Sequence, residues 1–376
     1  MSSIAVNAIT DANGGNTTSI NGTTPNAYNT VGKNLIINGA MRIDQRNSGS
    51  AVTINTTSNT YTLDRWMASG VVSDGVFTVV QSTEAPAGFN QSTKITVTTA
   101  DASIGSTESY VFGQFIEGNN VAHLNWGTSN AKTVTLSFWI RSSVTGTFSG
   151  VIHNSDVNKC YPFTYTISTA DTWEKQTVTV DGDTSGTWLS DTGRGIVVRF
   201  SLGVGSSLLN TAGAWASSTA LGATGETQLI STLNATLYIT GVQLEVGESA
   251  TEFEHRLLTL EQQLCYRYFY ASEGYYGNSS YQHSAYNTYI GLSVAASRWL
   301  WADFHFPVPM RATPTVTPRD AAGNPGKQSI WNSGGGSLAH NYDPYSMYGN
   351  NEVVHMSDYV NAKYGICGHL RLDAEL

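Results

Sequence analysis

The residues of this 376-residue chain that could do chemistry are scattered acids, histidines and aromatic side chains. The sequence has no GxSxG nucleophile motif, no HExxH zinc motif and no phosphate-binding loop of the GxxxxGK[ST] type. Glycoside hydrolysis needs two carboxyl groups about 5–10 Å apart. The acids considered for such a pair are Asp64, Glu117, Asp156 and Glu245. Because the chain has 28 acids, chance pairs are numerous, and the sequence favours a protein with no catalytic residues.

Metal-binding patterns are also weak. The eight histidines do not occur at metal-ligand spacing, and Cys160, Cys265 and Cys367 are too far apart for a zinc motif or a disulfide framework. We expect these cysteines to be reduced and mostly buried. The segment Asp181–Gly186 imitates the first half of a calcium loop, but Thr192 stands where the loop needs Glu. We interpret this segment as a β-turn and predict neither a metal nor a cofactor.

Aromatic residues are better candidates for a binding site. In the alternating segment Thr133–Arg141, Trp139 shares the polar face with Thr133, Thr135, Ser137 and Arg141. The other face is apolar and consists of Val134, Leu136, Phe138 and Ile140. Trp139 therefore either stacks on a sugar ring or is covered by another part of the protein.

Tyrosine is concentrated in the C-terminal part, where 13 of the 19 tyrosines lie from Tyr266 onward. Tyrosine suits both ligand-binding surfaces and subunit interfaces. The candidates for glycan or receptor contact there are Tyr275, Tyr276, Tyr281, Tyr345 and Tyr348. Burial between subunits is an equally weighted alternative.

Composition excludes several functional classes. Only 12% of the residues are charged, the net charge is −9, and the basic residues are not clustered. Nucleic-acid binding needs clustered Lys and Arg, so it is not expected. We expect no membrane insertion, because no apolar stretch approaches about 18 residues. The N-terminal sequence lacks the pattern of a signal peptide, so a conventional secretory precursor is not expected either.

Strand patterns dominate from Asn34 to Gly247, where about ten segments alternate or carry β-forming residues between turn signals. They include an apolar segment at Asn34–Asn38. This pattern predicts an all-β, antiparallel jelly-roll sandwich. Leucines at 257, 260 and 264 then repeat at helical spacing and predict one short amphipathic helix that packs at the junction between two domains. The expected domains are an N-terminal arm (1–33), the jelly roll (34–250), the junction helix (251–269) and a smaller β-rich, Tyr-rich domain (270–376).

Several motifs resemble bacteriophage tail-fibre and virion-appendage proteins that contain a carbohydrate-binding-module-like jelly roll. The matching segments are Asn34–Asn47, Tyr61–Trp66, Thr240–Gly247 with Ala250–Glu254, Leu260–Phe269 and Pro309–Val316. In this family the turn at Asn38-Gly39 and the residues Asp64, Arg65 and Trp66 are part of the framework. We expect Asn38-Gly39 to adopt a positive φ, and Asp64 and Arg65 to pair at a sheet edge beside a packed Trp66.

The resemblance implies a non-enzymatic phage virion structural protein, usually trimeric, that contacts the host surface. The favoured interpretation is a short tail fibre or fibre tip that takes part in attachment to a host-surface glycan. A tail adaptor or a capsid decoration protein with an assembly role only is the alternative, and a glycan depolymerase comes third. We expect a homotrimer, assembled in the host cytoplasm into the virion, whose N-terminal arm binds other virion proteins.

Overall fold

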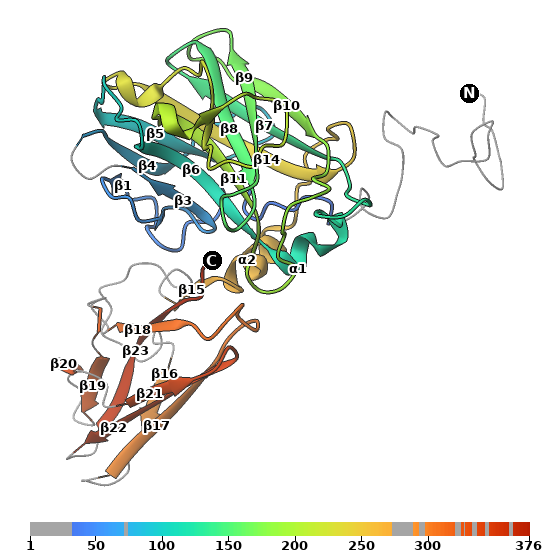
Figure 1. The fold of residues 1–376 in the computed structure, drawn as a ribbon. Helices are drawn as coiled ribbons and strands as arrows, with labels where there is room; N and C mark the ends of the chain where they lie inside the picture. Colours follow the sequence, from blue (N-terminus) through green and yellow to red (C-terminus); the bar gives the residue numbers. More distant parts are fainter. Residues whose placement is uncertain are drawn as a thin grey trace, which may run out of the picture. The chain divides into compact units, whose positions relative to one another are not determined.

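A computed structural model of the chain (Figure 1) describes residues 32–70, 74–272, 289–292, 298–319, 325–326, 328–332, 337–342, 346–360 and 364–376. Side chains are described for these residues except in the ranges 289–303, 327–349 and 354–368. The described residues form two compact units. The first unit contains residues up to 41, 53–59 and 68–255, and the second contains residues 42–52, 60–67 and 256–376. The sequence suggested one boundary near residue 250. The two observed units differ from this prediction in the segments 42–52 and 60–67, whose contacts group them with the C-terminal residues.

Two six-stranded antiparallel sheets form a jelly-roll sandwich, which consists mostly of first-unit residues and also includes residues 60–61 and 66–67. The first sheet has the order β1-β4-β5-β14-β7-β10 and the second β2-β3-β6-β11-β8-β9. The strands of the first sheet are β1 (Val52–Ile54), β4 (Val76–Ser82), β5 (Ser92–Thr99), β14 (Thr236–Val246), β7 (Val134–Ser142) and β10 (Glu174–Val180). The strands of the second are β2 (Thr60–Tyr61), β3 (Trp66–Ser69), β6 (Ser109–Glu117), β11 (Arg194–Val204), β8 (Gly146–His153) and β9 (Cys160–Ile167).

The core lies between the two sheets and follows the predicted alternation. Val134, Leu136, Phe138 and Ile140 of β7 are all fully buried. The ring of Phe138 meets those of Phe200 and Tyr165, from the other sheet, at centroid distances of 5.0 and 5.1 Å. Such edge-to-face aromatic packing adds to the stabilisation that apolar burial provides. This packing holds β7 in place and thereby fixes the positions from which its outward residues project.

Short elements complete the first unit. These are α1 (Gly118–Val121), η1 (Ala122–Leu124), η2 (Ser206–Leu208), η3 (Leu229–Ser231) and the parallel pair β12 (Leu209–Asn210) and β13 (Gly222–Ala223). The segment around β12 and β13 contributes Ala220 and Leu221 to a small apolar cluster with Val111, Val151 and Cys160 of the second sheet. This segment therefore covers part of that sheet's outer face.

Residues 34–39 and 41 are buried, but they form no strand, so the strand predicted at Asn34–Asn38 is wrong. The side chain of Asn34 replaces strand pairing: its Oδ1 accepts hydrogen bonds from Ile36 N (3.0 Å) and Leu244 N (3.1 Å), and its Nδ2 donates to Val242 O (3.1 Å). Asn38 has a positive φ of 57°, as predicted for this turn. Gly39 is required for another reason, because a Cβ there would collide with the Val242 carbonyl.

The C-terminal segment of the second unit contains α2 (Leu258–Tyr266), which is followed by strands. Its strands are β15 (Phe269–Ala271), β16 (Tyr289–Leu292), β17 (Arg298–His305), β18 (Thr315–Arg319), β19 (Gln328–Asn332), β20 (Ser337–Tyr342), β21 (Ser346–Gly349), β22 (Val353–Val360) and β23 (Tyr364–Asp373). Strand β23 is central, because β15, β16, β18 and β19 all pair with it antiparallel. Strands β17, β22 and β21 form a separate three-stranded sheet.

The helix is shorter than the predicted segment 251–269. Before it starts, backbone N–H groups are bound by side chains of β14: Thr251 N donates to Glu245 Oε1 and Glu254 N to Gln243 Oε1, both at 2.8 Å. The expected apolar stripe is also wrong in part, because Leu257 and Leu260 are 79% and 47% exposed.

Candidate functional site

The acids considered for hydrolysis are held by structural hydrogen bonds. Glu245 is buried and accepts from Thr251 N, Thr251 Oγ1 and Gln243 Nε2. Glu117 is buried and accepts from Asn119 Nδ2, whereas Asp156 is exposed. Asp64 lies in the second unit and accepts from the backbone N and the side-chain amide of Gln45. These contacts give Asp64 and Glu245 a role in holding the fold.

The metal-binding candidates also have structural contacts. Across the described residues, no group of three His, Cys, Asp or Glu side chains could hold a metal ion. Cys160 and Cys265 are free and buried. The calcium-like segment is tied by Asp183, which accepts hydrogen bonds from Gly186 N and Trp188 Nε1 and lies 3.4 Å from Lys159 Nζ. In the described part of the chain, no helix is long and apolar enough to cross a membrane.

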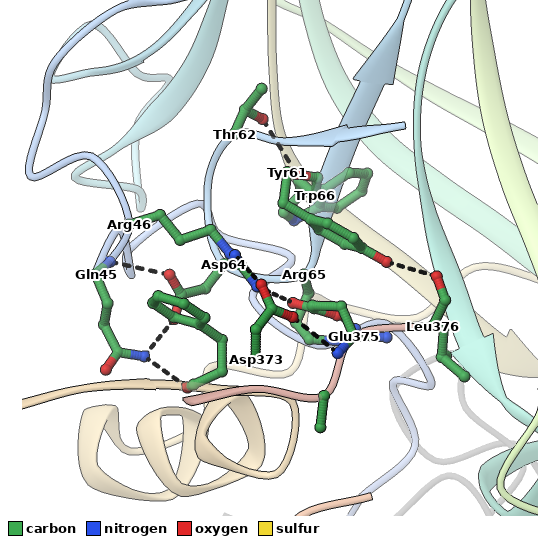
Figure 2. A network of polar contacts seen from close by, with 12 residues as sticks. Gln45, Arg46, Tyr61, Thr62, Asp64, Arg65, Trp66, Asp373, Glu375 and Leu376 are labelled. Carbon is green, nitrogen blue, oxygen red and sulfur yellow. Dashed lines mark hydrogen bonds and ion pairs between the residues drawn. The ribbon is translucent and has the colours of Figure 1, made fainter. Parts of the chain in front are cut away.

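A buried ionic network occupies the second unit (Figure 2). Arg65 and Glu375 form an ion pair in which their side chains are only 1% and 4% exposed. Arg46 pairs with Asp373 at 2.8 Å and with Glu375 at 3.2 Å. The expected pairing of Asp64 with Arg65 is therefore corrected: Arg65 pairs with Glu375, and Asp64 binds Gln45. Trp66 is fully buried, as predicted.

Aromatic rings cover both arginines of this network. Arg65 Cζ lies 3.5 Å from the Tyr268 ring centroid, and Arg46 Cζ lies 3.7 Å from that of Phe269. Burial opposes the charge of Arg46, but Glu375 and Asp373 outweigh this effect and raise its pKa. The network is therefore a cluster of paired charges that joins Arg46 and Arg65 to Asp373 and Glu375 near the C-terminal end.

Asp64 should make the stability of this unit depend on pH. Burial raises its pKa to about 6 from an ordinary value of 3.8, although Arg46 and Gln45 lower it. The unfolded carboxyl ionises near pH 4 while the folded one keeps its proton until about pH 6. Stability is therefore lost as the pH rises through this window, by about 3 kcal/mol once it is complete.

Replacing Asp64 by Asn removes this titration. We expect the free energy of unfolding of D64N, relative to the unsubstituted protein, to increase by about 2–3 kcal/mol between pH 4 and pH 7. Urea unfolding of both proteins at several pH values measures this difference. A difference that stays constant over this range would contradict the assignment.

The outer face of the first sheet carries aromatic and cationic side chains close to one another. Trp139 on β7 is half-buried and stands opposite Thr240 of β14 and Lys175 of β10. Two residues further along β7, Arg141 stands opposite Tyr238. Because residues two apart share a face, Trp139 and Tyr238 are diagonal neighbours on adjacent strands.

Cations surround Tyr238. Arg141 Cζ lies 5.1 Å and Lys94 Nζ 5.6 Å from its ring centroid. Arg141 is held in place by Asp171 O at 2.9 Å and by an ion pair with Glu84 at 3.3 Å. We name Trp139, Tyr238, Arg141, Lys94 and Lys175 the sheet-face platform. Trp173, whose ring centroid lies 6.1 Å from that of Tyr238, borders it.

A kink in β14 shapes the surroundings of Trp139. The pairing register with β7 shifts between Thr240 and Gln243, where Gly241 adopts a φ of 61°. A Cβ at Gly241 would lie 3.1 Å from Trp139 Cδ1 and 2.7 Å from the Phe89 ring. Gly241 therefore lies close to both Phe89 and Trp139, and Trp139 is only half-buried.

The other predicted contact residues cannot be compared with the platform. Tyr275, Tyr276, Tyr281 and Tyr345 lie outside the described residues, and Tyr348 lies in β21 at a position whose side chain is not described. Sequence reasoning missed Tyr238 and Trp173. Tyr238 had a detectable signal, because it occupies an outward position in the alternating segment Thr236–Val246.

Comparisons with known proteins give structural similarities alone. No protein-family model and no curated protein sequence matches the chain. The enzymatically active domain of tailspike protein 4 of bacteriophage CBA120 is similar with 13% identity and a TM-score of 0.30, over 57% of this chain and 21% of that one. The match thus spans about a fifth of the tailspike chain.

Two other proteins are similar over comparable shares of the chain. A candidate sugar-binding protein from Bacteroides thetaiotaomicron has 14% identity and a TM-score of 0.35, over 57% of this chain and all of that one. A family 11 carbohydrate-binding module from Clostridium thermocellum, solved with a mixed-linked tetrasaccharide, has 9% identity and a TM-score of 0.27, over 53% and 95%. At these scores, the jelly-roll assignment rests on the strand order of the chain itself.

Proposed function

We propose that this protein is a non-enzymatic phage virion structural protein, a short tail fibre or fibre tip, whose jelly-roll unit binds a host-surface glycan through the sheet-face platform. The observation that carries the proposal is the half-buried Trp139 beside Tyr238, Arg141 and Lys94 on the outer face of a sheet. An aromatic ring stacks on the apolar face of a sugar, while neighbouring cations donate hydrogen bonds to its hydroxyl groups.

The geometry of the platform supports ligand binding in two further ways. Trp139 and Arg141 project from β7, whose inner residues are fully buried, so the backbone that carries them is held in place before binding. Lys94 and Lys175 make no ion pair among the described residues, which leaves two ammonium groups beside the rings as donors. The virion role and the homotrimer are supported by the sequence motifs that resemble phage virion-appendage proteins.

Replacing Trp139 by Ala should weaken glycan binding by about five- to thirtyfold, because it removes about 1–2 kcal/mol of stacking. The protein would first be tested on an array of bacterial lipopolysaccharides, capsular polysaccharides and teichoic acids. Titration calorimetry on the strongest ligand then compares W139A and Y238A with the unsubstituted protein. Leu233, which is 56% exposed in a loop of the same unit, provides the control variant L233A.

The outcomes separate the alternatives. Loss of affinity in W139A with normal binding by L233A supports glycan recognition at the platform. If no glycan binds and antibody labelling places the protein inside the tail or on the capsid, the jelly roll is a spacer in an assembly protein. Degradation of the glycan during the titration would identify a depolymerase. Light scattering tests the trimer, which a monomer of 40.4 kDa would contradict.

A further inference from the structure

Three tryptophans from distant parts of the sequence meet in the loops of the jelly-roll unit. Trp126 follows η1, Trp188 lies between β10 and β11, and Trp215 lies between β12 and β13. Their ring centroids are 4.7 Å (126–188), 5.3 Å (126–215) and 5.4 Å (188–215) apart, and each pair is nearly perpendicular, at 78–79°. Tyr161 of β9 lies 5.4 Å from Trp215. We name these four residues the tryptophan corner.

Hydrogen bonds fix all three indole rings. Trp126 Nε1 donates to Lys132 O at 2.8 Å, Trp188 Nε1 to Asp183 Oδ2 at 3.0 Å and Trp215 Nε1 to Asp181 O at 2.6 Å. Two glycines make room for Trp188. A Cβ at Gly127 would lie 3.3 Å from its Cδ1, and one at Gly186 would lie 2.8 Å from its Nε1.

The corner is not a sealed core. Trp126 is 8% exposed, whereas Trp188, Trp215 and Tyr161 are half-buried. By contrast, Trp66 is fully buried. Large aromatic rings left partly exposed but held rigidly are costly for stability and favourable for binding, because their rotamer entropy has already been lost.

Polar groups border the rings and have their charges balanced. Lys159 Nζ lies 3.4 Å from Asp183 Oδ1 and donates to Ser185 Oγ at 2.9 Å. Burial opposes ionisation of Asp183, but hydrogen bonds from Trp188 and Gly186 and the charge of Lys159 lower its pKa overall. Asp183 therefore stays ionised and paired. The exposed Ser185 Oγ donates to Asp183 Oδ1 at 3.3 Å and accepts from Lys159, and its second lone pair can accept a hydrogen bond from a ligand.

We propose that the tryptophan corner is a second carbohydrate site, which takes one neutral pyranose ring such as the terminal sugar of a glycan. Perpendicular rings cannot all lie beneath an extended chain, but together they contact one face and one edge of a single sugar. The balanced Lys159–Asp183 pair disfavours an anionic ligand, since no unpaired cation is offered by the groups that border the rings. The proposal goes beyond the sheet-face platform and does not depend on it.

The test uses methyl glycosides of glucose, galactose, mannose and N-acetylglucosamine as probes, at millimolar concentrations, with the full chain. Binding is followed through the indole N–H signals in two-dimensional NMR, and each signal is assigned with a Trp→Phe variant. We expect one of the probes to shift the signals of Trp188 and Trp215, and W215A to weaken its binding at least about tenfold. L233A, a substitution outside both glycan sites, should bind the same probe unchanged. Thermal unfolding shows whether W215A is still folded.

The results distinguish the two glycan sites. If none of the four probes shifts the Trp188 or Trp215 signals, or if W215A binds the probe normally, the proposal is overturned. If W215A fails to fold, W215F and S185A replace it: S185A should weaken binding and leave the melting temperature unchanged. Unaltered binding by both of these variants also overturns the proposal. Binding that is lost in W139A and retained in W215A would support the platform and exclude the corner.

Discussion

Replacing Arg65 by Ala is expected to lower the free energy of unfolding of the second unit by about 3–5 kcal/mol, the cost of breaking one partner out of a buried ion pair. Glu375, only 4% exposed, would lose its partner. Tyr268 would lose the guanidinium that stacks 3.5 Å from its ring centroid. Arg46 remains beside Glu375 and limits the loss, so the double variant R46A/R65A should be less stable still.

Hydrogen exchange followed by mass spectrometry measures this loss locally. Peptides from β23 should exchange faster in R65A, whereas peptides from β7 should be unchanged. The control is R141A, which removes an arginine whose acidic partners Glu84 and Asp171 are more than half exposed. A surface pair of this kind contributes about 0–1 kcal/mol. Equal effects of R65A and R141A would contradict the assigned role of the buried network.

Replacing Asn34 by Ala should destabilise the first unit by about 2–5 kcal/mol, because it leaves buried backbone groups without partners. The Asn34 side chain bonds Ile36 N, Leu244 N and Val242 O. Gly39→Ala acts on the same contact and should cost a similar amount, because its methyl group would collide with the Val242 carbonyl.

The variant G213A is the control for G39A, because it replaces a glycine without causing a collision. It has a φ of 89°, and a Cβ added there would meet nothing within 4 Å, so G213A should cost only the strain of a left-handed conformation, about 1 kcal/mol. Chemical unfolding of the three variants, followed by tryptophan fluorescence, gives the comparison. If G39A is no less stable than G213A, the close approach of Gly39 to Val242 is not a constraint on the fold.

The strand pattern carried most of the information about the jelly roll. Alternation at Thr133–Arg141 correctly separated the buried Phe138 from the outward Trp139. The apolar residues after Asn34 were misread as a strand, because apolar content does not reveal that a side-chain amide takes over the hydrogen bonds of the backbone. The helix was predicted too long for a related reason, since side chains of β14 bind the N–H groups that precede it.

Contacts between distant segments could not be read from the sequence. Arg65 and Glu375 are 310 positions apart, so the neighbouring Asp64 was the natural but incorrect partner to expect. The tryptophans at 126, 188 and 215 each lie in a loop without periodicity, and only the fold brings them together. Within the platform, Trp139 was identifiable by its position on a polar face, whereas its neighbours depended on the strand order β5-β14-β7-β10.

The second unit consists of three separate segments of the chain, so its folding depends on the order in which they are synthesised. Its residues 42–52 and 60–67 are synthesised early, but β23, with which β15, β16, β18 and β19 pair, is synthesised after all of these strands. The jelly roll, whose residues 68–255 are contiguous, can fold while translation continues. Arg46 in the segment 42–52 acquires its partner Asp373 only after β23 has been synthesised. Translation therefore imposes an order on folding, and a fragment that starts at residue 256 lacks two pieces of the unit it is meant to contain.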